Sequence, residues 1–188
     1  MDALSDLLRR SRTSNADVRQ LIRRPPWSMT FDQAPPLTVF ATIGGPAVLR
    51  LDDRPEAPPA ELAPGDIALI TQSSRHTVSD DLTTPPQVVI RAGRKQLLGA
   101  PERHADLVNV LAPRTYGDGL PGATTVLRGT YEPQGDAGRR LLSTLPPVAR
   151  IPANPRTGAA LDLLSAETAL DRPGQDAVLH RMLDLILV

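Results

Sequence analysis

Short apolar runs rich in β-branched residues, separated by turn residues, dominate the middle of the chain. Such runs predict strands, because side chains alternate between the two faces of a strand and β-branched residues pack well there. The clearest runs are residues 37–43, 47–51, 67–71, 87–92 and 124–131, with shorter ones at 27–31, 76–78 and 148–151. Gly44, Gly45 and Pro46 lie between the first two runs and predict a hairpin. We therefore predict a mostly β protein, an antiparallel sandwich or barrel.

Helical spacing of apolar residues marks the two ends of the chain instead. Residues 2–12 predict an N-terminal helix, and residues 16–23 predict a second short helix that ends before Pro25 and Pro26. Residues 156–170 and 174–188 predict a C-terminal helical pair. The expected organisation is a barrel with its N-terminal helix over residues 1–155, followed by helices over residues 156–188.

One face of the last predicted helix is an apolar stripe of Leu179, Met182, Leu183 and Ile186. Two interpretations stay open. The stripe packs on the barrel, or it pairs with the same helix of a second subunit in a two-fold dimer. The apolar run that reaches Val188 carries no residue that would terminate a helix. For that reason we expect the natural protein to continue beyond Val188.

Composition removes several classes of function. The chain has 188 residues, no cysteine and a formal net charge of zero. The lack of cysteine excludes disulfides, thiolate catalysis and cysteine-bound zinc. A neutral chain is also unlike a free-standing DNA-binding module, which is usually basic. The chain has no apolar run of about 18 residues, the length needed to cross a membrane. Its first residues do not form a secretory signal. We expect a cytoplasmic protein without membrane contact.

The most informative stretch is residues 61–81, ELAPGDIALITQSSRHTVSDD. It predicts a turn at Pro64, Gly65 and Asp66, a buried strand, a polar loop and then His76 at the start of another strand. This order resembles the second signature motif of the cupin barrel. The Leu-x-Pro-Gly-Asp start and the His-x-x-Ser-Asp end resemble, more specifically, the N-terminal effector domain of AraC-family transcription regulators. Residues 39–53, 116–119 and 141–153 extend the resemblance over nearly the whole chain.

The resemblance implies a cupin-like antiparallel β-barrel, or double-stranded β-helix, of about eight strands. It also implies the effector-sensing and dimerisation domain of a bacterial regulator. Such a domain binds a small molecule, forms a homodimer through its C-terminal helices, and reaches DNA only through a helix-turn-helix domain that this chain lacks. The alternative is a stand-alone cupin protein that binds or converts a small molecule.

The resemblance departs from metal-dependent cupins at the residues that would bind the metal. Phe40 stands where this family often has histidine, and no histidine precedes His76. A single imidazole is a poor site, because divalent metals in proteins take three or more protein ligands. We therefore expect no metal, no cofactor and no enzymatic activity.

Four residues are candidate ligand contacts. Phe40 and Thr42 share one face of their strand by the two-residue period, and that face either fills the barrel or lines a cavity. His76 either reaches an effector from the barrel mouth or is a structural histidine bonded to its own loop. Arg128 is expected to face solvent; if it pointed inward, its guanidinium would suit an anionic effector.

Overall fold

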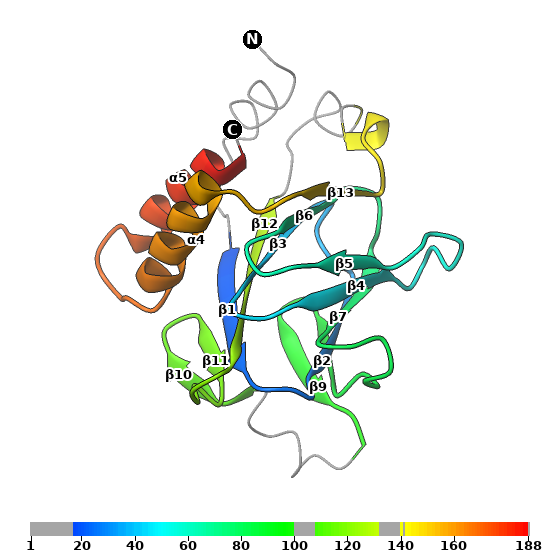
Figure 1. Cartoon of the computed structure of the whole chain (residues 1–188), viewed down its shortest axis with the longest axis horizontal. Helices are drawn as coiled ribbons and strands as arrows, with labels where there is room; N and C mark the ends of the chain where they lie inside the picture. The colour runs from blue at the N-terminus through cyan, green and yellow to red at the C-terminus, as the bar shows by residue number, and fades with distance from the viewer. Residues whose placement is uncertain (1–16, 100–107, 132–139, 141, 188) are drawn as a thin grey trace.

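Two β-sheets and two helices make up the fold in the computed structural model, which describes residues 17–99, 108–131, 140 and 142–187. The helices α4 (Pro155–Thr168) and α5 (Gln175–Leu187) lie side by side against one sheet, beside β1 (Asp17–Arg23), as Figure 1 shows. The predicted C-terminal helical pair is therefore observed. The predicted N-terminal helix at residues 2–12 lies outside the described residues.

The first sheet, called sheet A, has seven strands and carries β1 near its middle. Its order is β10 (Val110–Ala112), β11 (Thr115–Gly117), β1, β12 (Thr124–Tyr131), β3 (Leu37–Ile43), β6 (Ile67–Ile70) and β13 (Val148–Ile151). Every neighbouring pair is antiparallel except β1 and β11.

The second sheet, called sheet B, has six strands. Its order is β5 (Ala60–Leu62), β4 (Ala47–Leu51), β7 (Arg75–Ser79), β2 (Ser28–Asp32), β8 (Val88–Arg91) and β9 (Arg94–Leu97). Within the described parts of the chain no ladder joins sheet A to sheet B. The protein is mostly β, as predicted, but its two sheets do not close into the predicted barrel.

The hydrophobic core has two layers, because sheet A is buried on both faces. One layer lies between the sheets and includes Trp27, Phe31 and Phe40. The other lies between sheet A and the helices and includes Leu164 and Leu183. Alternate residues of one strand therefore serve different layers. The predicted division into residues 1–155 and 156–188 stays a prediction, although the helices share the second layer with sheet A.

Asp66 connects the Pro-Gly-Asp turn to the start of α4. Its side chain is 2% exposed and accepts hydrogen bonds from the backbone N–H groups of Ala63 and Ala153 and from Arg150 Nε, each at 2.8 Å. Asn154, which follows Ala153, caps α4 because its side chain accepts hydrogen bonds from the backbone N–H groups of Arg156 and Thr157 at 3.0 Å. One buried carboxylate thus fixes where the chain leaves sheet A and enters the helical pair.

Most strand predictions match the structure. Residues 37–43, 47–51, 124–131 and 148–151 are β3, β4, β12 and β13. The predicted helix at residues 16–23 is wrong, since residues 17–23 form β1. They pair with β12 on one side and β11 on the other, and two ladders outweigh the weak helical preference of the segment.

None of the helices among the described residues has the length and apolar character needed to cross a bilayer.

Replacing Asp66 with asparagine is expected to lower the free energy of unfolding by about 2–4 kcal/mol, because an amide cannot accept all these hydrogen bonds or pair with Arg150. Burial alone would raise the pKa of Asp66, but its hydrogen bonds to Ala153, Ala63 and Arg150 lower the pKa below the ordinary 3.8. The stabilisation is therefore present above pH 3.8 and lost as pH falls through the lowered folded pKa.

Urea unfolding of the wild type, Asp66→Asn and the exposed control Asp171→Asn, repeated down the acid range, would measure this. An Asp66→Asn protein as stable as the Asp171→Asn protein would contradict it.

Candidate functional site

A cavity of about 170 Å³ lies between the two sheets. Its walls are mostly apolar and come from both sheets: Leu21, Met29, Phe31, Phe40, Val88, Ile90 and Val126. Its polar side chains are few: Asp17, Arg19, Gln20, Lys95, Tyr116 and Arg128. An apolar cavity with a small number of convergent polar groups is the usual composition of a small-molecule site.

A row of three side chains crosses the inner face of sheet A. Arg19 of β1 lies opposite Arg128 of β12, and Arg128 lies opposite Phe40 of β3. Residues directly opposite one another on neighbouring strands share a face. The expectation that Arg128 faces solvent is therefore wrong, because the register of β12 points it into the cavity.

Arg128 is less exposed than Arg19 and Lys95, the other two cations of the cavity. Its guanidinium carbon lies 4.6 Å from the centre of the Phe31 ring, a cation–π contact. Its Nε is buried and has no hydrogen-bond partner among the described residues. Burial lowers the pKa of Arg128, the charge of Asp17 opposes this and the charge of Arg19 adds to it, so that the resulting pKa is about 10. Arg128 therefore stays positively charged at neutral pH.

Arg19, Lys95 and Tyr116 lie together at the rim of the cavity. The Lys95 ammonium, from sheet B, lies 2.8 Å from the centre of the Tyr116 ring, which belongs to sheet A. Arg19 donates to the Tyr116 hydroxyl at 3.3 Å and pairs with Asp17 at 2.7 Å. Burial, and then the charge of Arg19, lower the pKa of Lys95 to about 8.

His76 lies behind the cavity rather than in its wall. It is fully buried, with its ring centre 5.4 Å from that of Phe31 and 5.5 Å from that of Phe40. Neither of its nitrogens has a hydrogen-bond partner among the described residues. Burial, together with the charge of Arg128, lowers its pKa to about 3, so the ring is neutral at physiological pH. His76 supports the two phenyl rings by packing.

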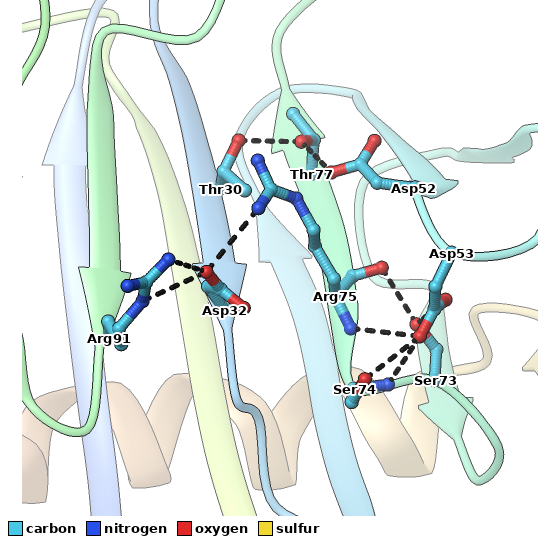
Figure 2. Close-up of polar contacts among 9 residues, drawn as sticks. All are labelled: Thr30, Asp32, Asp52, Asp53, Ser73, Ser74, Arg75, Thr77 and Arg91. Atoms are coloured by element: carbon cyan, nitrogen blue, oxygen red, sulfur yellow. Dashed lines mark hydrogen bonds and ion pairs between the residues drawn. The ribbon is translucent and has the colours of Figure 1, made fainter.

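A cluster of carboxylates fixes the loop that precedes His76 (Figure 2). Asp53 accepts hydrogen bonds from the side chains of Ser73 and Ser74 and from the backbone N–H groups of Ser74 and Arg75. Asp32 pairs with Arg75 and Arg91 from the strands on either side. Each carboxylate here has partners, so the cluster is structural and holds β7 against β2.

Of the four candidate ligand contacts, two lie in the cavity wall. Phe40 and Arg128 line the cavity. Thr42 shares the inner face of β3 but is fully buried and donates to the Ala63 carbonyl at 2.9 Å, and neither it nor His76 is part of the cavity wall.

The three rim residues Arg19, Lys95 and Tyr116 were missed. Lys95 carries one signal that could have found it, since it is the only lysine among 21 lysine and arginine residues.

The proposed dimer stripe on α5 packs inside the chain. Leu179, Leu183 and Ile186 are buried in the layer between sheet A and the helices, and Met182 packs against it. An adjoining face of α5 is exposed, with Val178 45% and Leu185 66% exposed. Dimerisation stays a prediction, but these four residues already have partners within the chain.

No three histidine or carboxylate side chains of the described residues come close enough together to hold a metal ion. The cavity itself offers a single carboxylate, Asp17, which is paired with Arg19.

A family model described as Cupin matches residues 2–188. The chain belongs to the cupin family. In this cupin domain the candidate site is the cavity between the two facing sheets. No curated protein matches the chain.

The solved structures similar to this cupin chain include ToxT from Vibrio cholerae. An apo variant of ToxT has a TM-score of 0.49 and 10% identity, with 93% of this chain and 53% of that chain covered. ToxT with a bound unsaturated fatty acid has a TM-score of 0.41 and 10% identity, with 91% and 50% covered. This chain thus spans about half the length of ToxT. Likeness at this level does not identify a ligand.

Replacing His76 with leucine is expected to leave the free energy of unfolding at pH 7 within about 1 kcal/mol of the wild type, or to raise it, because two buried nitrogens without partners are removed. Since the folded pKa is about 3 and the ordinary value 6.5, the unfolded chain binds a proton that the folded chain does not. The wild type therefore loses stability as pH falls below 6.5, by at most about 1.4 kcal/mol per pH unit from this residue.

Chemical denaturation of both proteins between pH 7 and pH 4.5 would show whether leucine flattens this loss. A large destabilisation at pH 7, or an unchanged pH slope, would mean that the imidazole has a polar role.

Proposed function

We propose that this cupin chain is the effector-sensing domain of a bacterial AraC-family transcription regulator. A small molecule binds in the cavity between the sheets, and a separate helix-turn-helix domain binds DNA. The cavity, apolar with a few convergent polar groups, is the observation that carries the proposal. Membership of the cupin family and the AraC-like pattern of residues 61–81 support it. The zero net charge of the chain suits an arrangement in which DNA is held elsewhere.

The strand β12 supplies the route from ligand to helices. Arg128 faces the cavity, while the next residue, Gly129, faces α5. The approach there is so close that a Cβ added to Gly129 would meet the side chain of Leu183. On β1, Gln20 accepts from the Ser165 hydroxyl of α4 at 2.8 Å. A ligand that shifts β12 or β1 thus shifts the helical pair.

Coupling of this kind needs two arrangements of the helices that differ in their affinity for the ligand. In the proposed mechanism the ligand favours one arrangement and so changes how the DNA-binding domains are presented. We propose that the ligand is bound and released unchanged, which makes this domain a sensor rather than an enzyme.

We also propose that the regulator is a homodimer through its C-terminal helices. The surface for it is the exposed strip of α5 formed by Val178 and Leu185, two turns apart on one face. The strip is apolar apart from Arg181 at its edge and lies beside the face that packs on sheet A, so a second copy can cover it without disturbing the fold.

The cavity is tested by filling it. Ile90 lines the cavity, whereas its neighbour Val89 points to the other face of β8. In a small-molecule screen, compounds that raise the Tm of the wild type and of the control Val89→Phe should fail to raise that of Ile90→Phe. Hits that stabilise Ile90→Phe equally would place the ligand elsewhere, and hits recovered chemically altered would favour an enzyme.

The dimer is tested on the exposed strip. Sedimentation equilibrium should show a dimer for the wild type and at least about tenfold weaker association for Leu185→Lys, because a desolvated charge costs more than about 1.4 kcal/mol. Leu163→Lys, on the exposed face of α4, is the matched control. A monomeric wild type, or an unaffected Leu185→Lys protein, would remove dimerisation from the proposal.

A further inference from the structure

Three cations and one carboxylate meet at the cavity. Arg19, Lys95 and Arg128 line it together with Asp17, which pairs with Arg19. Among the described residues of the cavity wall, no other carboxylate compensates the remaining positive charge. Arg19 and Lys95 are exposed to solvent at the rim, whereas the Arg128 Nε is buried without a partner, so Arg128 carries the cost of desolvation when the cavity is empty.

The register of sheet A makes this arrangement more costly. Arg19 and Arg128 are direct cross-strand partners on one face, and like charges directly opposite one another destabilise a sheet. Lys95 approaches the same place from sheet B, close enough that the charge of Arg19 lowers its pKa. Features that oppose folding in this way are expected at functional sites rather than in structural ones.

The Arg128 guanidinium is placed to bind an anion. Its Nε is buried without a hydrogen bond, and the Phe31 ring covers one side of the guanidinium. A guanidinium is planar and presents parallel N–H groups that match the two oxygens of a carboxylate. An anion placed there would satisfy the buried donor and offset the repulsion from Arg19.

The cavity also limits the rest of the ligand. Its walls include Phe40, Ile90 and Val126, which suit an apolar body. Its volume of about 170 Å³ is close to that of apolar cavities of about 150 Å³ that bind benzene. A long alkyl chain would have to extend out of this space toward solvent.

We propose that the ligand is a compact aromatic or branched monocarboxylate, whose carboxylate binds the Arg128 guanidinium while its apolar body lies between the two sheets. This rests on the proposed function, since it names the ligand class of the same cavity. Arg19 and Lys95 attract the acid to the rim, and Lys95 leaves the Tyr116 ring to face the bound anion.

The test compares acids with neutral amides of the same shape on the 188-residue chain at constant ionic strength. The probes are benzoate with benzamide, phenylacetate with phenylacetamide, and dodecanoate below its micelle concentration. Calorimetry and Tm shifts should detect the two aromatic acids and show at least about tenfold weaker binding of the amides. Equal binding of acid and amide, or tighter binding of dodecanoate, would overturn the proposed class.

The Arg128→Met variant separates this role from a structural one. It should lose acid binding yet melt about 2–8 °C higher than the wild type, because a buried charge whose Nε has no hydrogen-bond partner is removed while contact with Phe31 is kept. Arg156→Met, at an exposed position of α4, should bind as the wild type does. Acid binding that survives Arg128→Met would contradict the proposal.

The rim adds a pH readout. Around Lys95 the charged and titratable groups are Arg19 and Asp17 on β1, Tyr116 on β11 and Arg128 on β12. Acid affinity should fall as pH rises through about 8, where Lys95 loses its charge, and Lys95→Arg should abolish that fall. An affinity independent of pH would remove Lys95 from the site.

Failure of the ligand class is distinguishable from failure of the sensing function. If no acid binds but neutral compounds from the screen bind wild type and not Ile90→Phe, the anionic ligand is wrong and the sensor stands. If every compound that raises the Tm of the wild type raises that of Ile90→Phe equally, both proposals are wrong.

Discussion

The register of β12 between β1 and β3 is the constraint on which the rest of the structure depends. Because side chains alternate along a strand, one choice of register sends Leu127, Gly129 and Tyr131 toward the helices and Arg128 into the space between the sheets. A slip of one residue would bury the guanidinium under α5 and open the cavity wall. The same pairing that builds the core therefore places the candidate ligand group, with helix contact and cavity contact on adjacent residues.

Two kinds of charged group follow from this arrangement. Asp66 and Asp53 hold loops in place, and each accepts several hydrogen bonds from groups that would otherwise be unsatisfied. Arg128 and its neighbour Arg19 instead face one another across a ladder, and the deeper of them lacks a partner for its Nε. In the first kind the fold satisfies the charge; in the second the charge is left for something else to satisfy.

The strands rich in β-branched residues could be predicted from sequence, as β3 shows. Their pairing could not, because the hairpin predicted at Gly44–Gly45 is wrong: β3 lies in sheet A and β4 lies in sheet B. The rim could not. The hairpin that carries Lys95 turns at Ala92 and Gly93, both at positive φ, and alanine is not a residue that signals such a turn. Whether Arg128 pointed in or out could not be read from alternation alone, because that depends on which face of sheet A the helices cover.

The most direct measurement is the side-chain Nε–H resonance of Arg128 in a ¹⁵N NMR titration, assigned by its loss in Arg128→Met. The account predicts that benzoate shifts this resonance saturably and that an equal concentration of benzamide does not, since the buried Nε gains a partner only from the acid. If benzoate binds while the Arg128 resonance stays where it is, the guanidinium is not the ligand's partner and the account of this cavity is wrong.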